Sequence, residues 1–200
     1  MPAAIVRPAL VLTALLMLLT GAVYPAVVTG LSQLAFPDQA NGSLVRREGR
    51  VVGSALIGQG FARAEYLHPR PSAAGDGYDG MASSGTNKGP TDAKLADTLV
   101  AGAVARIVAE DGASKGAIPA DYATSSGSGL DPHVSPAAAL LQVSRIARAR
   151  GADSTRVRAL IEQRIEGRTA GLLGEPRVNV LLVNLDLDRE LPLRGAANTP

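Results

Sequence analysis

The longest apolar segment of the chain lies at its N-terminal end. Residues 8–37 contain no Asp, Glu, Lys or Arg over thirty consecutive positions. About 20 apolar residues in a helix cross the core of a bilayer, and a single span in lipid must be helical to satisfy its backbone hydrogen bonds. The pattern therefore predicts an N-terminal tail and transmembrane helix over residues 1–37, followed by a soluble domain over residues 38–200.

A cleaved signal peptide is the alternative interpretation of this run, with Arg7 as its basic region and residues 9–20 as its apolar region. Two features argue against cleavage. The run is longer than the usual apolar region of about 7–15 residues, and residues 22–25, Ala-Val-Tyr-Pro, make a poor cleavage site. We therefore expect an uncleaved anchor.

Small residues recur every four positions in the second half of the run, at Ala22, Ala26 and Gly30. Helices associate in lipid by close packing, so a face of small side chains predicts contact with a partner helix. The alternative is chance, because Ala and Gly are frequent in this chain.

The charges beside the run bear on which side of the membrane the domain occupies. Arg7 precedes the run, whereas Arg46, Arg47 and Arg50 follow it, and this count alone favours a cytoplasmic domain. However, long domains translocate largely regardless of charge, and the short tail has more influence. We expect a cytoplasmic N-terminus and a domain outside the cytoplasm.

The polar and apolar pattern of the soluble part predicts an α+β fold. It favours a β-hairpin turning at Glu48-Gly49, three helices of period 3.6 and one late buried strand. In order these are a hairpin over 43–58, helices over 91–112, 135–151 and 153–165, and a strand over 178–183, followed by a helical turn over 184–191 and a disordered tail from Pro192. We expect the late strand to join the hairpin in a small, mostly antiparallel sheet covered by helices.

Composition excludes several function classes. Twenty Lys and Arg against eighteen Asp and Glu give a net charge of +2, which is too small for a nucleic-acid interface. The chain has no Cys, so disulfides and thiolate chemistry are excluded, and with no Trp and only two Phe its core must be largely aliphatic. Arginines 145, 148, 150, 156, 158, 164 and 168 are expected on solvated helix faces, with Arg145 and Arg148 facing outward, rather than around an anion.

Catalytic and metal sites are not expected. The two histidines, His68 and His133, are too few for a site without further ligands. Ser126, Ser128, Asp131 and His133 have the residue types of a hydrolase triad. They lie within eight positions of one another, however, and Gly127-Ser128-Gly129 lacks the nucleophile-elbow pattern.

Two loops rich in Gly, Ser and Thr, residues 83–91 and 124–136, each precede a predicted helix. Backbone amides of such loops can cradle an anion, which makes Ser126, Gly127, Ser128 and Gly129 a candidate nucleotide loop. They can equally form rigid turns whose side chains bond their own backbone, and the residue types favour this second interpretation.

Five segments together resemble the KdpC family, the small single-span subunit of the bacterial Kdp potassium-transporting P-type ATPase. The matching residues follow the family order behind one N-terminal span. They are 58–61, 66–72, 89–91, 126–136 with Ala138 and Gln142, and 174–180. The chain departs from the family pattern at Ser84 and Lys88, where Gly and Leu are usual, and at Leu67, where Phe is usual.

The resemblance implies a non-catalytic subunit of the bacterial inner membrane. It would assemble with a channel-like potassium-binding subunit and an ATP-hydrolysing P-type subunit. The family has also been described as a nucleotide-binding chaperone that raises the ATP affinity of the catalytic subunit, with the loop at 126–129 likened to an ABC-transporter signature. The resemblance also favours a domain outside the cytoplasm, which could not reach a cytoplasmic ATP site. We therefore expect no tightly bound cofactor and at most weak ATP binding.

Overall fold

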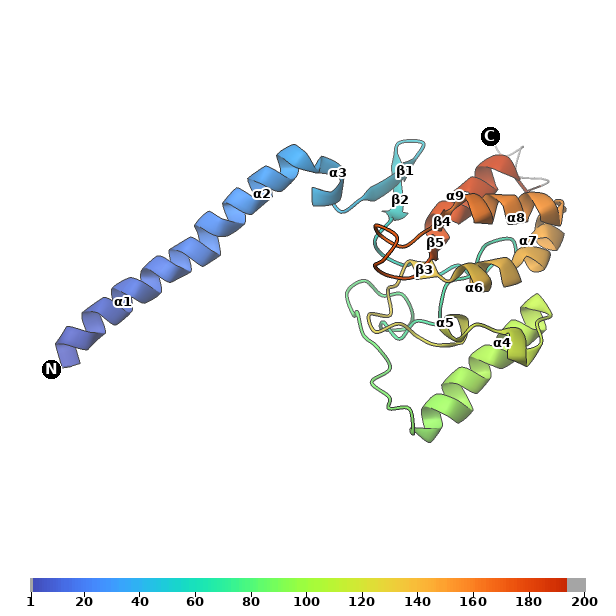
Figure 1. Cartoon of the computed structure of the whole chain (residues 1–200), viewed down its shortest axis with the longest axis horizontal. Coiled ribbons are helices and arrows are strands. Elements are labelled where there is room, and N and C mark those ends of the chain that lie inside the picture. Colours follow the sequence, from blue (N-terminus) through green and yellow to red (C-terminus); the bar gives the residue numbers. More distant parts are fainter. Residues whose placement is uncertain (1, 194–200) are drawn as a thin grey trace. The chain divides into compact units, whose positions relative to one another are not determined.

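The computed structural model describes residues 2–193, and the side chains from residue 4 onward. The chain forms two compact units, one ending at Val52 and the other beginning at Gly53 (Figure 1). Each unit has its own secondary structure. The predicted disordered tail from Pro192 lies, from residue 194 onward, outside the described residues.

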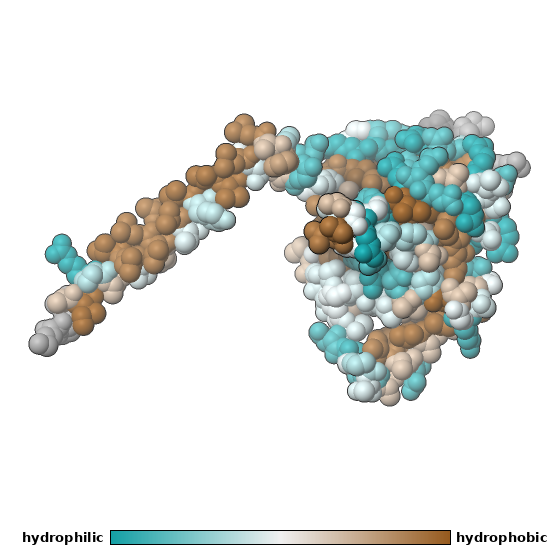
Figure 2. Space-filling view, viewed as in Figure 1, coloured by the Kyte–Doolittle hydropathy of each residue, from teal (hydrophilic) through white to brown (hydrophobic). Residues whose placement is uncertain are grey.

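A long apolar helix makes up most of the N-terminal unit. It runs through α1 (Pro2–Leu18), a π-helical turn η1 (Leu19–Val23) and α2 (Tyr24–Ala35). Apolar residues cover nearly its whole length (Figure 2). Residues Ala4–Ala35 form a 32-residue stretch, which among the described residues is the one helix long and apolar enough to cross a membrane.

Pro25 explains the π-helical turn in this helix. Proline has no backbone N–H, and its ring clashes with the carbonyl four residues earlier, which here belongs to Gly21. The backbone widens ahead of the proline, so that Tyr24 N bonds to Leu19 O, five residues back. Thr20 Oγ1 donates to Leu16 O at 2.7 Å and satisfies one further carbonyl of this region.

The predicted hairpin is confirmed, although its strands are short. After α3 (Pro37–Ala40) come β1 (Leu44–Arg47) and β2 (Arg50–Ser54), which pair in a two-stranded sheet. Glu48 and Gly49 have φ of 51° and 78°. Two consecutive positive φ angles are those of the type I′ turn, whose twist matches that of the strands it joins.

The C-terminal unit consists of helices around a small sheet (Figure 1). The helices are η2 (Leu95–Val100), α4 (Ala101–Asp111), η3 (Lys115–Ala117), α5 (Ala120–Ala123), α6 (Pro136–Leu141), α7 (Val143–Arg150), α8 (Ser154–Gln163) and α9 (Val180–Glu190). The strands are β3 (His133–Val134), β4 (Ile165–Glu166) and β5 (Arg177–Asn179). Their order is β3-β5-β4, and both pairings are antiparallel.

This topology corrects the expected sheet. The late strand does not join the hairpin, because β5 pairs with β3 and β4, and Val178 lies opposite both Val134 and Ile165. Strands of two residues leave no alternating pattern in the sequence. The α+β class is confirmed, but the partners of the late strand were wrong.

The predicted strand over 178–183 is also too long. β5 ends at Asn179, and the next residues begin α9, which ends at Glu190 and so contains all but the last residue of the helical turn predicted over 184–191. Asn179 Oδ1 accepts the Leu182 amide at 3.2 Å and caps the helix, while the Val180 amide bonds to Pro132 O at 2.9 Å. A short run of buried aliphatic residues does not distinguish a strand from a helix by period alone.

Local signals correctly located the starts of α6 and α8 and the ends of α4 and α7, whereas the short η3 and α5 were not predicted. Ser135 Oγ accepts the Ala138 amide at 3.1 Å and begins α6, and Asp153 Oδ1 accepts the Thr155 amide at 2.8 Å at the start of α8. Gly112 and Gly151 end α4 and α7 with φ of 68° and 59°. The helix expected over 135–151 is interrupted only at Gln142, which separates α6 from α7.

Candidate functional site

The segment from Arg63 to Ser72 forms neither helix nor strand, yet it passes through the core of the C-terminal unit. Leu67, His68 and Pro69 are buried. A buried backbone without a regular ladder must find other partners for its N–H and C=O groups. Here the partners are two amide side chains.

Asn184 of α9 pairs with the backbone of Leu67, and Gln142 pairs with that of His68. Asn184 Oδ1 accepts the Leu67 amide at 2.7 Å, and its Nδ2 donates to Leu67 O at 3.0 Å. Gln142 Oε1 accepts the His68 amide at 2.7 Å, and its Nε2 donates to His68 O at 3.1 Å. Each side chain thus replaces the two hydrogen bonds of a neighbouring strand.

Two arginines of α7 complete this clamp, which corrects the expectation for Arg145. Arg145 and Arg150 are only 5% and 3% exposed, whereas Arg148 faces solvent as expected. Arg145 Nη1 donates to Ala64 O and Tyr66 O at 2.7 and 2.9 Å, and its Nε pairs with Asp111 at 2.7 Å. Arg150 donates to the carbonyl oxygens of Glu65, Leu187 and Leu191.

The other arginines of this region vary in exposure. Arg164 pairs with Asp186, and Arg168 pairs with Glu175 across a loop. The pattern i, i+3, i+4 could not identify Arg145 and Arg150 as buried, because each has at least one acceptor carbonyl group about 80 residues earlier in the chain.

The same clamped segment, residues 63–72, holds the glycine-serine loop, residues 124–136, through Arg70 and Ser72. Arg70 Nη1 pairs with Asp131 at 3.0 Å, and its Nε and Nη2 donate to Thr124 O and Ser125 O at 3.3 and 3.4 Å. Ser72 Oγ donates to Gly129 O at 2.6 Å. Burial opposes ionisation of Asp131, but hydrogen bonds from His133 and Arg70 outweigh it and lower the pKa of the Asp131 carboxyl.

The two glycine-rich loops lie against each other, which the sequence did not reveal. The Ser84 amide and the Ser83 hydroxyl both donate to Ser128 O, at 3.0 and 2.9 Å. Gly129 has φ of 68°, and a Cβ at this position would lie 2.5 Å from Ser84 O. Only glycine fits this backbone without displacing its neighbours.

The loop at 126–129 also bonds to itself. Ser126 Oγ accepts the Gly129 amide at 2.9 Å, and Ser128 Oγ accepts the Leu130 amide at 3.1 Å. Two donors that a phosphate could have used are thereby satisfied inside the loop, as in the rigid-turn alternative. Among the described residues, no hydrogen bond joins His133 to either serine, so the triad residue types are not arranged as a triad.

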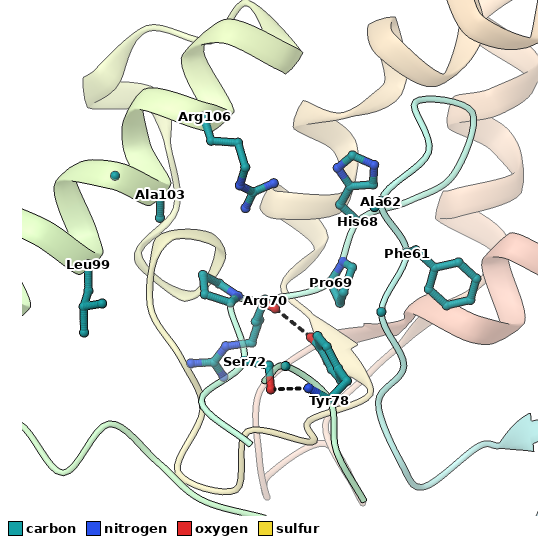
Figure 3. Close-up of a pocket in the computed structure, with 14 residues that line it drawn as sticks. Phe61, Ala62, His68, Pro69, Arg70, Ser72, Tyr78, Leu99, Ala103 and Arg106 are labelled. Carbon is teal, nitrogen blue, oxygen red and sulfur yellow. Dashed lines mark hydrogen bonds between the residues drawn. The ribbon is translucent and has the colours of Figure 1, made fainter. Parts of the chain in front are cut away.

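Two adjoining hollows lie beside this loop system. The larger, of about 640 Å³, is lined by residues of the clamped segment and of α4; its walls include His68, Arg70, Tyr78, Leu99 and Arg106 (Figure 3). Tyr78 Oη donates to Arg70 O at 2.6 Å at its edge. His68 lies on the wall of this hollow. Its burial lowers the pKa of its imidazole, and the positive charge of Arg145 lowers it further.

The smaller hollow, of about 410 Å³, shares Pro71, Ser72 and Leu99 with the first and adds Lys88 and Lys94. Residues 126–129 line neither hollow. Over residues 2–193, no three His, Asp or Glu side chains are grouped in a way that could hold a metal ion. The site is therefore a braced loop system beside a cationic hollow.

Comparison with known proteins shows similarity along almost the whole chain. The model of a family described as KdpC, K+-transporting ATPase, c chain, matches residues 6–189. The Potassium-transporting ATPase KdpC subunit of Gemmatimonas aurantiaca is 60% identical over 183 residues, which cover 91% of each chain. The KdpC subunit of Myxococcus xanthus is 59% identical over 90% of this chain and 86% of its own, and that of Rhodospirillum rubrum is 54% identical over 94% and 96%.

Proposed function

Since this chain belongs to the KdpC family, and is thus an accessory subunit of the Kdp potassium-transporting ATPase, we propose that it performs no chemistry and instead stabilises the assembled complex. Its partners in this proposal are a channel-like potassium-binding subunit and an ATP-hydrolysing P-type subunit. The complex would lie in the bacterial inner membrane, with the helix at Ala4–Ala35 as the anchor of this subunit.

The observation that carries the proposal is the bracing of the glycine-serine loop. Its carbonyl and carboxylate groups bond to Arg70, Ser72, Ser83 and the Ser84 amide, and its hydroxyl groups bond to its own backbone. A loop fixed in this way presents a constant shape, which lowers the entropy lost on binding another protein. This supports a structural role for residues 126–129.

The anchor would contribute the second contact. Ala22 lies in η1, and Ala26 and Gly30 lie in α2. Side chains this small allow a neighbouring helix to approach closely in lipid. Co-purification tests the proposal: partner subunits carrying an affinity tag should retain this chain in detergent, and failure to retain the wild-type chain would contradict it.

We place the soluble domain outside the cytoplasm, and a cysteine scan can test this in a chain that has no native Cys. Ala159→Cys lies on the exposed side of α8, and Ala4→Cys lies near the start of the anchor. In intact spheroplasts, a membrane-impermeant thiol reagent should label Ala159→Cys and leave Ala4→Cys unlabelled until the membrane is opened. The reverse labelling pattern would place the domain in the cytoplasm.

A nucleotide-binding chaperone is the second candidate, and one observation favours it. The smaller hollow is lined by Lys88 and Lys94 together with the hydroxyl residues Thr86, Thr124 and Ser125. Against it, Lys88 pairs with Asp92 at 3.0 Å, and the loop likened to a nucleotide signature does not line the hollow. We therefore favour the structural role.

A further inference from the structure

The connection between β4 and β5 carries two leucines into solvent. Leu172 is 80% exposed and Leu173 69% exposed, the two most exposed leucines among the described residues of the C-terminal unit. They lie in a loop, residues 167–176, that leaves the sheet and returns to β5 (Figure 1). We call residues 169–173 the leucine tip.

The leucine tip has a fixed backbone. Thr169 and Leu173 exchange two hydrogen bonds, at 2.8 and 3.0 Å, and the Leu172 amide also bonds to Thr169 O at 3.1 Å. Ala170 and Gly171 have φ of 53° and 73°, which is the turn geometry that reverses a hairpin tightly. Below the turn, Arg168 Nη2 bonds to both carboxylate oxygens of Glu175, at 2.7 and 2.6 Å.

Two features of the leucine tip are unfavourable for the isolated subunit. Ala170 adopts a left-handed conformation that residues with a side chain rarely adopt, and such outliers gather at functional surfaces. The two neighbouring leucines expose apolar surface without covering any other part of the chain. Both features would be offset if the tip became buried in a partner.

The chemistry of the loop indicates a protein partner rather than lipid. The charged residues at the base of the loop form two ion pairs. Arg168 pairs with Glu175, and Arg177 pairs with Glu166 at 2.9 Å. Loops and helices that enter the membrane surface use aromatic or excess basic residues, and residues 166–177 contain no aromatic residue and no net charge. Two exposed leucines on a fixed turn, with charged residues at its base, are instead complementary to a protein pocket that is apolar inside and polar at its rim.

We propose that Leu172 and Leu173 insert into an apolar recess of another subunit of the transport complex, with Arg168 and Glu175 meeting the polar rim of that recess. The inference rests on the proposed function, since it requires an assembled complex. The leucine tip would make a contact separate from those of the anchor and of the glycine-serine loop.

Thiol accessibility tests the insertion directly. Leu172→Cys, the only cysteine in the full chain, is labelled with an uncharged maleimide in detergent, once as the subunit alone and once in complex purified through a tag on a partner subunit. We expect labelling at least about tenfold slower in the complex. Ala159→Cys on α8, also exposed, is the control and should react at equal rates in both.

Two outcomes would overturn the proposal. Equal labelling rates of Leu172→Cys in the two preparations would show that no subunit covers the tip. Protection of the subunit alone in liposomes of neutral lipid, without partners, would assign the tip to the membrane instead. Wild-type chain that is not retained by the partners would contradict the proposed function itself, whereas a retained chain with a reactive tip contradicts only this inference.

A double variant gives an independent readout. Leu172→Ser with Leu173→Ser should leave the thermal unfolding of the subunit alone unchanged, because both side chains are exposed. Its recovery with tagged partners should fall at least about fivefold. Recovery at the wild-type level would contradict the insertion.

Discussion

Gln142 holds the backbone of His68 by both of its hydrogen-bonding groups, at 2.7 and 3.1 Å, although the two residues are 74 positions apart. Gln142 is fully buried, and its Oε1 also accepts from Arg145 Nη2 at 2.6 Å. Its Nε2 also donates to Ala138 O of α6 at 3.2 Å, so one side-chain amide joins the clamped segment to both α6 and α7. This contact is one of those that hold residues 63–72 in the core, together with Asn184 and Arg145.

Gln142→Leu should destabilise the protein strongly. The change keeps a similar volume but leaves the His68 backbone and one Arg145 donor without this partner, at a cost of about 3 kcal/mol for buried groups. For a chain of this size we expect a Tm lower by roughly 6–12 °C. Circular dichroism melts of the purified chain in detergent measure it. Gln163→Leu on the exposed side of α8 is the matched control and should melt like the wild type.

Gly129→Val should displace the glycine-serine loop, because its Cβ would meet Ser84 O and a φ of 68° is strongly unfavourable for a β-branched residue. Left-handed strain and overpacking together give about 2–4 kcal/mol of destabilisation. Gly127→Ala is the control, since a Cβ there has no atom within 4 Å. Recovery with tagged partners should fall for the first variant only. Normal assembly of Gly129→Val with lost ATP-dependent behaviour would favour the nucleotide role.

Acid should weaken the fold through His68. Burial and the Arg145 guanidinium lower the pKa of His68 in the folded chain below its ordinary value of about 6.5. The unfolded chain then binds the proton more readily, so stability is complete above about pH 6.5 and falls as the pH drops below it. Urea midpoints between pH 5 and 8 measure the slope. His68→Gln should flatten it; an unchanged slope in this variant would exclude His68 as the cause.

Ala26→Leu should loosen the complex without affecting insertion of the anchor. A larger side chain on the small-residue face keeps a partner helix at a greater distance, and close packing is what stabilises helix pairs in lipid. Co-purification in mild detergent is the measurement. Val27→Leu adds bulk at the neighbouring position and should assemble normally. Wild-type recovery of Ala26→Leu would argue against the predicted face.

ATP should bind weakly to the purified chain. The hollow offers one exposed lysine, Lys94, one lysine already paired with Asp92, and no aromatic platform, so we expect a dissociation constant on the order of 1 mM. Exposed ionic contacts are screened by salt, so this binding should fade as salt is added. Titration calorimetry at two salt concentrations tests it. Saturable ATP binding with a micromolar dissociation constant that does not change with salt would instead favour the nucleotide-binding chaperone.

Local chemistry accounts for what the sequence predicted correctly. The apolar run, the Ser135 and Asp153 caps and the Glu48-Gly49 turn each depend on neighbours a few residues away. The clamp could not be predicted in this way, because Asn184 meets Leu67 across 117 positions and Arg150 meets Glu65 across 85. Two-residue strands such as β3 acquire their identity only from β5, which pairs with them.

The π-helical turn at Leu19–Val23 changes how the membrane helix should be read on a helical wheel. A turn that bonds five residues back contains one residue more than a regular turn, so α1 is rotated about the axis relative to α2. The face that contains Ala26 and Gly30 therefore continues into α1 along positions one residue earlier than an unbroken α-helix would assign. Pro25→Ala restores a backbone N–H and would allow the π-helical turn to become a regular α-helical turn. Every side chain of α1 would then rotate about the helix axis relative to α2. A single substitution that adds no charge and no bulk would then move one half of the anchor out of alignment with its neighbour.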